Sequence, residues 1–242
     1  MSKLTNTKFN RLLKYYTLIN HDLIYNNKTI NRYKNKVQNK NKSIKLEKLK
    51  QNISNINNCH LKKNATNLVF ADGNSDAKIM LIGEGPGANE DKEGIPFVGR
   101  AGQLLDKMLA AIDLNRSKVY ITNVVNFRPP DNRKPTPEEI NRYLPFLKEH
   151  IQIINPKILV LLGSTALNAL IGDEIVISKA RGKWISKKIG NTSINIIASF
   201  HPAFLMRQPE QKKLAWIDLK MIKKMSEQLN IEIEENKINK RS

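Results

Sequence analysis

Short runs of apolar residues recur along the chain, separated by longer segments of mixed character. Runs without polar alternation are typical of strands that are buried on both faces of a parallel sheet. Four such runs predict strands at 78–83, 119–125, 157–163 and 194–199. A shorter run, Leu68-Val69-Phe70, predicts one more short strand.

The segments between these runs carry apolar residues at helical spacing. They predict helices that begin near Arg100, that cover Pro137 to about Ile154, that pass through Ala166 to Leu170, and that cover 209–229. Because strands alternate with helices, the predicted fold class is α/β. We expect an open, mostly parallel four-stranded sheet core, flanked by helices on both faces.

The first quarter of the chain differs in composition. Residues 9–24 predict a short amphipathic helix, and 26–58 are dominated by Asn, Lys and Ser, which predicts a flexible or loosely helical basic connector. The sequence therefore predicts three parts: residues 1–58 form an N-terminal helix and linker, 59–230 the main globular domain, and 231–242 a charged tail. A solvated linker and a tether to the DNA backbone are equally compatible with the connector.

Charge points to a polyanionic partner. The net charge is +19 and the pI is about 9.9, which favours nucleic acid. An AT-rich genome would also enrich Lys, Asn and Ile without selection for DNA binding. The single cysteine, Cys59, indicates a reducing compartment, and the sequence has no apolar run of the length of a signal peptide or a membrane span. We therefore expect a cytoplasmic protein with no membrane partner.

A glycine-rich turn follows the first main strand. Gly83, Gly85 and Gly87 allow close approach of a ligand to the backbone, and an acidic loop follows them. A dinucleotide-binding loop is the alternative, but the G-x-G-x-x-G spacing is missing. Strand, glycine turn, loop and helix is how an open α/β sheet builds a site at the carboxyl ends of its strands.

Three polar groups follow or end predicted strands, namely the segment 84–97, Asn123 and His201. A carboxylate, an amide, an aromatic ring and an imidazole at one sheet edge would suit a planar ligand that forms hydrogen bonds. Each also has a structural explanation of its own. Phe97 suits a core, His201 suits a loop cap, and Asn123 suits a strand end whose backbone it satisfies.

Four motifs in this order carry a resemblance to a known family. They are the segments 83–99, 120–125, 128–130 and 201–207, and the first contains Gly83-Glu84-Gly85-Pro86-Gly87. Together they resemble the thermostable-type, or family 4, uracil-DNA glycosylases over about residues 59–225. The resemblance implies an α/β enzyme that hydrolyses the bond between uracil and deoxyribose in DNA, which begins base excision repair.

The resemblance also implies roles for individual residues. Glu90 and His201 match catalytic residues, which act on the attacking water and on uracil O2. Five positions match the uracil pocket: Gly85, Pro86, Gly87, Phe97, which stacks on the base, and Asn123, which reads its edge. The loop that enters DNA is matched by Pro202, Ala203, Leu205, Met206 and Arg207, with Leu205 or Met206 as the wedge that fills the gap left by the base.

The cysteines depart from the family pattern. Members of this family usually hold a four-iron, four-sulfur cluster on four cysteines. Here only Cys59 matches a ligand position, and the other three positions are occupied by Ile56, Phe127 and Tyr143. We therefore expect no metal site and no cofactor, with apolar packing in place of the cluster.

The prediction from sequence is a monofunctional uracil-DNA glycosylase that acts as a monomer without an obligate protein partner. The alternative is a lapsed glycosylase that still binds uracil-containing or single-stranded DNA. A covalently trapping relative has a histidine in the segment that corresponds to 178–184, and this chain has none there.

Overall fold

The computed structural model describes residues 32–172, 175–190 and 192–231, with the side chains of 32–40 and of Thr192 left aside. The predicted helix at 9–24 and residues 232–242 of the tail lie outside the described residues. The chain divides into two compact units, Met1–Gln38 and Asn39–Ser242. Of the first unit, only the start of helix α2 is described.

One sheet forms the centre of the second unit, in the order β1-β3-β2-β4-β6-β5. Its strands are β1 (Asp72–Gly73), β2 (Ile79–Gly83), β3 (Val119–Asn123), β4 (Ile158–Leu162), β5 (Trp184–Ile189) and β6 (Thr192–Ser199). The four central strands are parallel, which confirms the predicted core. The edge strands β1 and β5 are antiparallel to their neighbours and were not predicted.

The run at 68–70 is not a strand, contrary to the prediction. Val69 instead donates its backbone N–H to the carbonyl of Asn126 at 2.9 Å, and its side chain is fully buried. The apolar run is therefore explained by packing of a loop, and the edge of the sheet is formed two residues later by Asp72 and Gly73.

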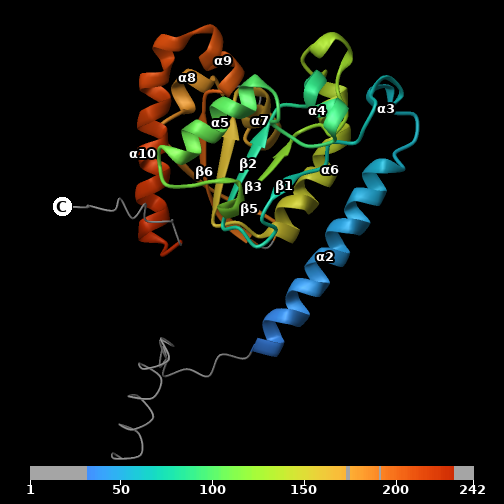
Figure 1. Cartoon of the computed structure of the whole chain (residues 1–242), viewed down its shortest axis with the longest axis horizontal. Coiled ribbons are helices and arrows are strands. Elements are labelled where there is room, and N and C mark those ends of the chain that lie inside the picture. Colours follow the sequence, from blue (N-terminus) through green and yellow to red (C-terminus); the bar gives the residue numbers. More distant parts are fainter. Residues whose placement is uncertain (1–31, 173–174, 191, 232–242) are drawn as a thin grey trace, which may run out of the picture. The chain divides into compact units, whose positions relative to one another are not determined.

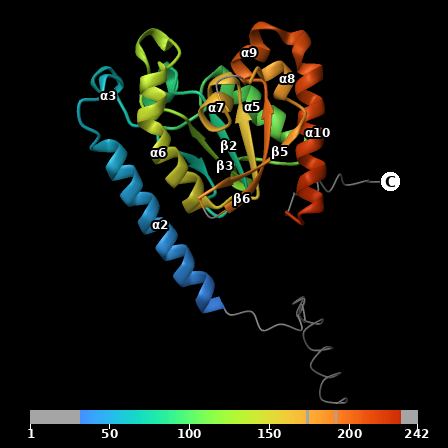
Figure 2. The ribbon, with the colours of Figure 1, turned by 180° about the vertical axis from the view of Figure 1, so that it is seen from behind.

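Helices cover both faces of the sheet (Figures 1 and 2). They are α2 (Arg32–Ser54), α3 (His60–Asn64), α4 (Ala88–Glu93), α5 (Arg100–Ala110), α6 (Pro137–Ile154), α7 (Ser164–Leu170), α8 (Ile177–Ala180), α9 (Pro202–Arg207) and α10 (Lys212–Gln228). Within the described residues, 3-10 turns lie at Arg116–Lys118 before β3, at Pro130–Asn132 after β3, and at Pro209–Gln211 between α9 and α10. The predicted helices correspond to α5, α6, α7 and α10.

The apolar runs separate into two cores because alternate residues of a strand point to opposite faces. In β2, Ile79 and Leu81 join the core beneath α5 and α10, whereas Met80 and Ile82 join the core beneath α6 and α7. The residues of β4 alternate in the same way. A run that looks uniform in the sequence is thus shared between two helical layers.

Helix α2 is regular from Arg32 to Ser54, whereas the sequence predicted a flexible or loosely helical connector. Its C-terminal part packs on the α6 side of the sheet through Leu49 and Ile53, which are almost fully buried. Each contributes roughly 1.5–3 kcal/mol from apolar burial. Lys42 adds an ion pair with Asp76 at 3.0 Å. The division of the chain at residue 58 stays a prediction.

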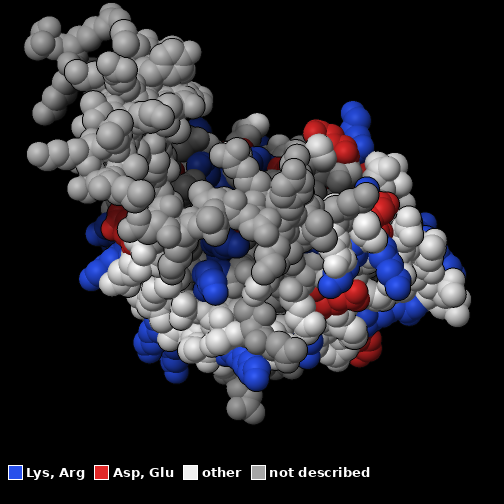
Figure 3. All heavy atoms as spheres, turned by 90° about the horizontal axis from the view of Figure 1, so that it is seen from below, with Lys and Arg blue, Asp and Glu red and all other residues white. Residues whose placement is uncertain are grey.

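Charge is spread over the face at the amino ends of the parallel strands (Figure 3). Where the described residues are visible in this view, Lys and Arg side chains lie among uncharged residues and some carboxylates. In the part of the chain that the structure describes, no helix has the length and apolar character needed to cross a bilayer. The features that suggest a ligand lie at the opposite edge of the sheet.

Candidate active site

A cavity of about 510 Å³ opens at the carboxyl ends of the central strands, where open α/β sheets bind their ligands. We call it the main pocket. Segments that follow β2, β4 and β6 line it, together with the end of β3 and the loop at 129–135. Nine residues that the sequence predicted for the site lie on its walls: Gly85, Pro86, Gly87, Glu90, Phe97, Asn123, His201, Ala203 and Arg207.

Asn123 brings an unsatisfied acceptor to the pocket. It is the last residue of β3, in register with Gly83 of β2, and its side chain is 3% exposed. Its Oδ1 atom is buried and has no hydrogen-bond partner among the described residues. A buried acceptor without a partner costs about 1–3 kcal/mol, so its retention here indicates that a ligand supplies the donor.

Gly83 makes room for both the amide and the neighbouring ring. A Cβ atom at this position would lie 2.4 Å from Asn123 Oδ1 and 2.5 Å from Cζ of Phe97. The Phe97 ring is in turn stacked near the ring of His201, with centroids 5.6 Å apart and planes at 28°. The side-chain amide of Asn123 and the ring of Phe97 therefore both lie against Gly83, which forms the glycine floor of the pocket.

His201 is held in one tautomer by the start of α9. The backbone N–H of Ala203 donates to His201 Nδ1 at 3.2 Å. Nδ1 must then carry its lone pair, so the proton of the neutral ring is on Nε2. Burial lowers the pKa of His201 to about 4. The positive charge of Arg207 lowers this pKa further, whereas the negative charge of Glu90 opposes the shift. At neutral pH the ring is uncharged and offers one N–H donor.

Glu90 is fixed at the N-terminus of α4. Its Oε2 accepts the N–H of Gly87 at 3.1 Å, and its Oε1 accepts the N–H of Gly99 at 2.8 Å. These bonds join both ends of the acidic loop and hold the carboxylate against the pocket wall. Each oxygen keeps a lone pair, so the group can still accept a hydrogen bond from water.

No role was predicted from the sequence for several residues that line the pocket. Glu84 follows β2 directly and lines the pocket. Its Oε2 accepts a hydrogen bond from the hydroxyl group of Thr165 at the start of α7. In the sequence it belongs to the motif 83–87 and to the polar segment 84–97, but no individual role was predicted for it. Phe200 and Phe204, on either side of His201, also line the wall.

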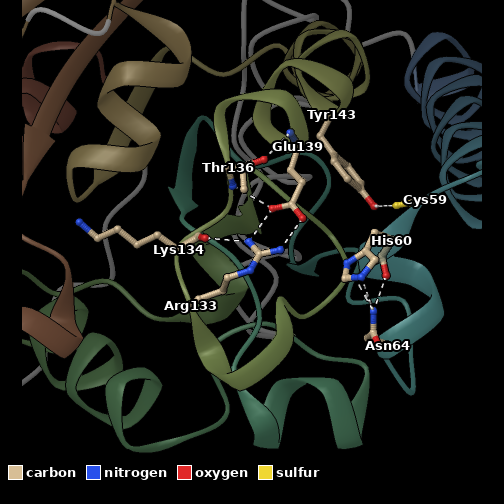
Figure 4. A network of polar contacts seen from close by, with 8 residues as sticks. All are labelled: Cys59, His60, Asn64, Arg133, Lys134, Thr136, Glu139 and Tyr143. Atoms are coloured by element: carbon tan, nitrogen blue, oxygen red, sulfur yellow. Dashed lines mark hydrogen bonds and ion pairs between the residues drawn. The ribbon is translucent and has the colours of Figure 1, made fainter.

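The resemblance included 128–130, but no role was predicted for Arg133 or Lys134 in the loop before α6 (Figure 4). Arg133 forms an ion pair with Glu139 at 2.6 Å, and Glu139 completes a capping box with Thr136. These contacts anchor the loop to the helix, and Arg133 and Lys134 reach the pocket. The residue pattern of 128–137 does not by itself indicate that this loop lines the pocket.

The segment that resembles the DNA-entering loop is the short helix α9. A second cavity of about 460 Å³, lined by Arg100, Met206 and Arg207 among others, adjoins the main pocket. Met206 is 37% exposed, whereas Leu205 is 1% exposed and packs in the core beneath α5 and α10. This corrects the expectation for Leu205, because the helical turn directs it inward and leaves Met206 as the wedge candidate. Pro202 is also buried.

The four positions that match cluster ligands lie in one apolar environment, which we call the Cys59 corner. Cys59 and Tyr143 are hydrogen-bonded, with 3.3 Å between Sγ and the phenol oxygen (Figure 4). Phe127 is buried in the same core, and Ile56 packs against it. An iron–sulfur cluster needs several thiolates, so this donor set does not fit one. No group of three or more His, Cys, Asp or Glu side chains among the described residues could hold a metal ion.

Comparisons with known proteins show the family of the chain. A model of the Uracil DNA glycosylase superfamily matches residues 70–220. The type-4 uracil-DNA glycosylase of Thermotoga maritima is 44% identical over 166 residues, which are 67% of this chain and 83% of that protein. That of Archaeoglobus fulgidus is 38% identical over 181 residues, which are 73% of this chain and 91% of that protein.

This chain therefore belongs to the uracil-DNA glycosylase superfamily. A further type-4 enzyme, from Sulfurisphaera tokodaii, is 41% identical over 186 residues, or 75% of this chain and 84% of that protein. The resemblance to the family 4 enzymes is confirmed.

Proposed function

We propose that this protein is a uracil-DNA glycosylase that hydrolyses the bond between uracil N1 and deoxyribose C1′. The observation that carries the proposal is the unpaired, buried Oδ1 of Asn123 beside the Phe97 ring and the neutral imidazole of His201. These groups offer an acceptor, a stacking face and an N–H donor. Uracil has a donor, a flat ring and a carbonyl acceptor to match.

Recognition in this proposal belongs to Asn123. Its Oδ1 accepts a hydrogen bond from uracil N3–H, and its amide nitrogen donates a hydrogen bond to O4. Cytosine has an acceptor at N3 and an amino donor at C4. Against the same amide, its N3 would face the acceptor Oδ1 and its amino group would face the donor nitrogen, so neither hydrogen bond could form. A site with fixed polar groups rejects such a mismatch strongly, because its buried groups are left unpaired.

Catalysis in this proposal belongs to His201 and Glu90. As the C1′–N1 bond breaks, its electron pair passes to the uracil ring, and His201 Nε2–H stabilises the charge on O2. A fixed donor of this kind lowers the free-energy barrier to bond cleavage by on the order of 3 kcal/mol. Glu90 orients the water whose oxygen bonds to the oxocarbenium-like C1′ and whose proton leaves to solvent or to the departing base.

The DNA backbone has a path beside the pocket. Arg100 and Arg207 line the adjoining cavity and carry positive charge suited to phosphates. In this proposal the exposed Met206 fills the gap in the base stack when uracil leaves it. Uracil must leave the duplex before it can enter a cavity of this kind.

We also propose that the protein acts without an iron–sulfur cluster. The single cysteine and the bonded pair of Cys59 and Tyr143 support this. None of the groups assigned to catalysis lies in the Cys59 corner, so the chemistry above does not require the cluster. Action as a monomer in the cytoplasm stays a prediction from the sequence.

The test is single-turnover cleavage of an oligonucleotide with one uracil, measured as alkali-labile abasic sites. A matched oligonucleotide with cytosine controls for specificity. His60→Ala, at an exposed histidine, is the matched control for His201→Ala. We expect cleavage by the wild type and by His60→Ala, and a sharp loss in His201→Ala. Tight binding of the uracil strand without cleavage would instead establish the lapsed, DNA-binding alternative.

A further inference from the structure

The backbone of Phe97 is in a conformation that aromatic residues rarely adopt. Its φ is +57°, in the left-handed region, where a bulky side chain is strained by about 1–3 kcal/mol. The side chain is 5% exposed and lies on the wall of the main pocket. Such strain persists only where the surrounding structure enforces it, so the contacts that enforce it matter to the site.

Arg116 supplies one of these contacts. Its Nη1 donates to the carbonyl of Pro96 at 3.1 Å, and its Nη2 donates to the carbonyl of Phe97. The planar guanidinium can serve two successive carbonyls at once, which a lysine ammonium cannot do in the same fixed geometry. Arg116 thus sets the direction of both peptide groups that flank the Phe97 backbone.

Gly102 supplies the second contact. A Cβ atom at Gly102 would lie 1.6 Å from the carbonyl oxygen of Phe97. The carbonyl therefore occupies the space that a side chain in the first turn of α5 would take. Gly102 and Arg116 together fix the direction of the Phe97 carbonyl group. The backbone orientation in turn determines where the Phe97 ring lies.

Arg116 is itself held in place by two carboxylates. Its Nη1 lies 2.6 Å from Asp72 Oδ2 on β1, and its Nε lies 2.8 Å from Asp106 Oδ1 on α5. The side chain is 26% exposed. The guanidinium thereby joins the sheet edge, α5 and the loop that carries Phe97.

We propose that Arg116 is a positioning residue for the stacking ring of Phe97. Arg116 does not line the main pocket, so it acts on the base only through the loop. The inference rests on the proposed function, because the ring position matters only if a planar base lies against it. A purely structural role would lower stability and leave base recognition unchanged.

The test compares Arg116→Gln with a matched arginine. Arg142 also donates to two loop carbonyls, those of Asn57 and Asn58, and it does not line the pocket. We expect Arg116→Gln to weaken the affinity for free uracil and the cleavage of uracil-DNA about tenfold each, with the same pH profile as the wild type. Arg142→Gln should match the wild type in both measurements.

A double-mutant cycle with Phe97→Ala separates positioning from general support of the fold. If Arg116 acts through the ring, Arg116→Gln should cost less than twofold once the ring is absent. A tenfold loss in both backgrounds would overturn the inference. If Arg116→Gln does not unfold cooperatively, Arg116→Lys replaces it, because lysine keeps the charge near Asp72 and Asp106 but loses the planar fork.

The two proposals fail in different ways. A wild type that binds free uracil but cleaves nothing would overturn the catalytic proposal, and the affinity comparison between the wild type and Arg116→Gln would still decide the role of Arg116. A wild type that cleaves uracil-DNA, with Arg116→Gln unchanged in rate and affinity, would overturn the positioning role alone.

Discussion

The main pocket and the Cys59 corner treat their buried polar groups in opposite ways. In the pocket, Asn123 Oδ1 has no partner among the described residues. In the corner, the Cys59 thiol and the Tyr143 hydroxyl satisfy each other at 3.3 Å. The first region keeps its hydrogen-bonding capacity for a ligand, and the second uses it for packing. Substitutions should therefore change activity in the pocket and stability in the corner.

The largest expected effect is in the pocket, at His201. Replacing His201 with Ala removes the Nε2–H donor, and we expect the single-turnover rate to fall about 10²–10³-fold. The free energy of unfolding, measured by urea titration, should change much less than the barrier to cleavage. A rate loss that only matched a loss of folded protein would contradict the assignment.

Asn123→Asp sharpens the assignment of recognition. The substitution replaces the donor end of the amide with an acceptor, which opposes uracil O4 and removes the penalty against the amino group of cytosine. We expect uracil cleavage to fall about 100-fold, and the ratio of uracil to cytosine cleavage to fall as well. The ratio is measured on paired oligonucleotides. An unchanged ratio would place base recognition elsewhere.

The pH dependence of the free energy of unfolding tests a buried histidine outside the pocket, in the core beneath α6 and α7. His150 on α6 stacks on Phe70 and bonds to the Tyr120 hydroxyl at 2.8 Å. Burial lowers the pKa of His150 to about 3. The unfolded state therefore binds a proton near pH 6.5 that the folded state does not bind, and stability falls as the pH drops below 6.5. This group should cost about 2 kcal/mol between pH 7 and pH 5.

The measurement is urea unfolding at several pH values for the wild type and for His150→Phe, which keeps the stack and removes the titration. The variant should lose less stability on acidification, although it leaves the Tyr120 hydroxyl unpaired at every pH. Parallel pH curves for the two proteins would show that His150 is protonated in the folded state.

The smallest expected effect is in the Cys59 corner. Cys59→Ala leaves the Tyr143 hydroxyl unpaired, and we expect a loss of about 1 kcal/mol in the free energy of unfolding. Cleavage should be unchanged. Cys59→Ser, which keeps a bonding partner, is the control and should lose less. Purified protein should contain no stoichiometric iron, and a cluster lost upon Cys59→Ala would overturn this view of the corner.

The sequence predicts the parts of the molecule that depend on strand order. Because parallel strands end at one edge, Glu90, Asn123 and His201 had to converge, and they do. The edge strands β1 and β5 escaped prediction because their residues are largely polar or exposed, and pairing with a neighbour defines them.

Other features depend on tertiary contacts that no local pattern records. Arg133 reaches the pocket because Glu139 anchors its loop. Leu205 and Met206 are equally apolar in the sequence, and only the orientation of α9 buries one and exposes the other. The strain at Phe97 likewise depends on Arg116, nineteen residues away in the chain.

The glycine floor of the pocket, Gly83, restricts which substitutions such a protein can accept during evolution. One methyl group at Gly83 would overlap both Asn123 Oδ1 and the Phe97 ring, so a single alanine there would close the site without touching a catalytic group. A lineage under selection to remove uracil cannot accept that change, whereas a lineage released from this selection needs only to move Asn123 or Phe97 to relieve the overlap. An alanine at position 83 would therefore mark a relative that has abandoned the activity.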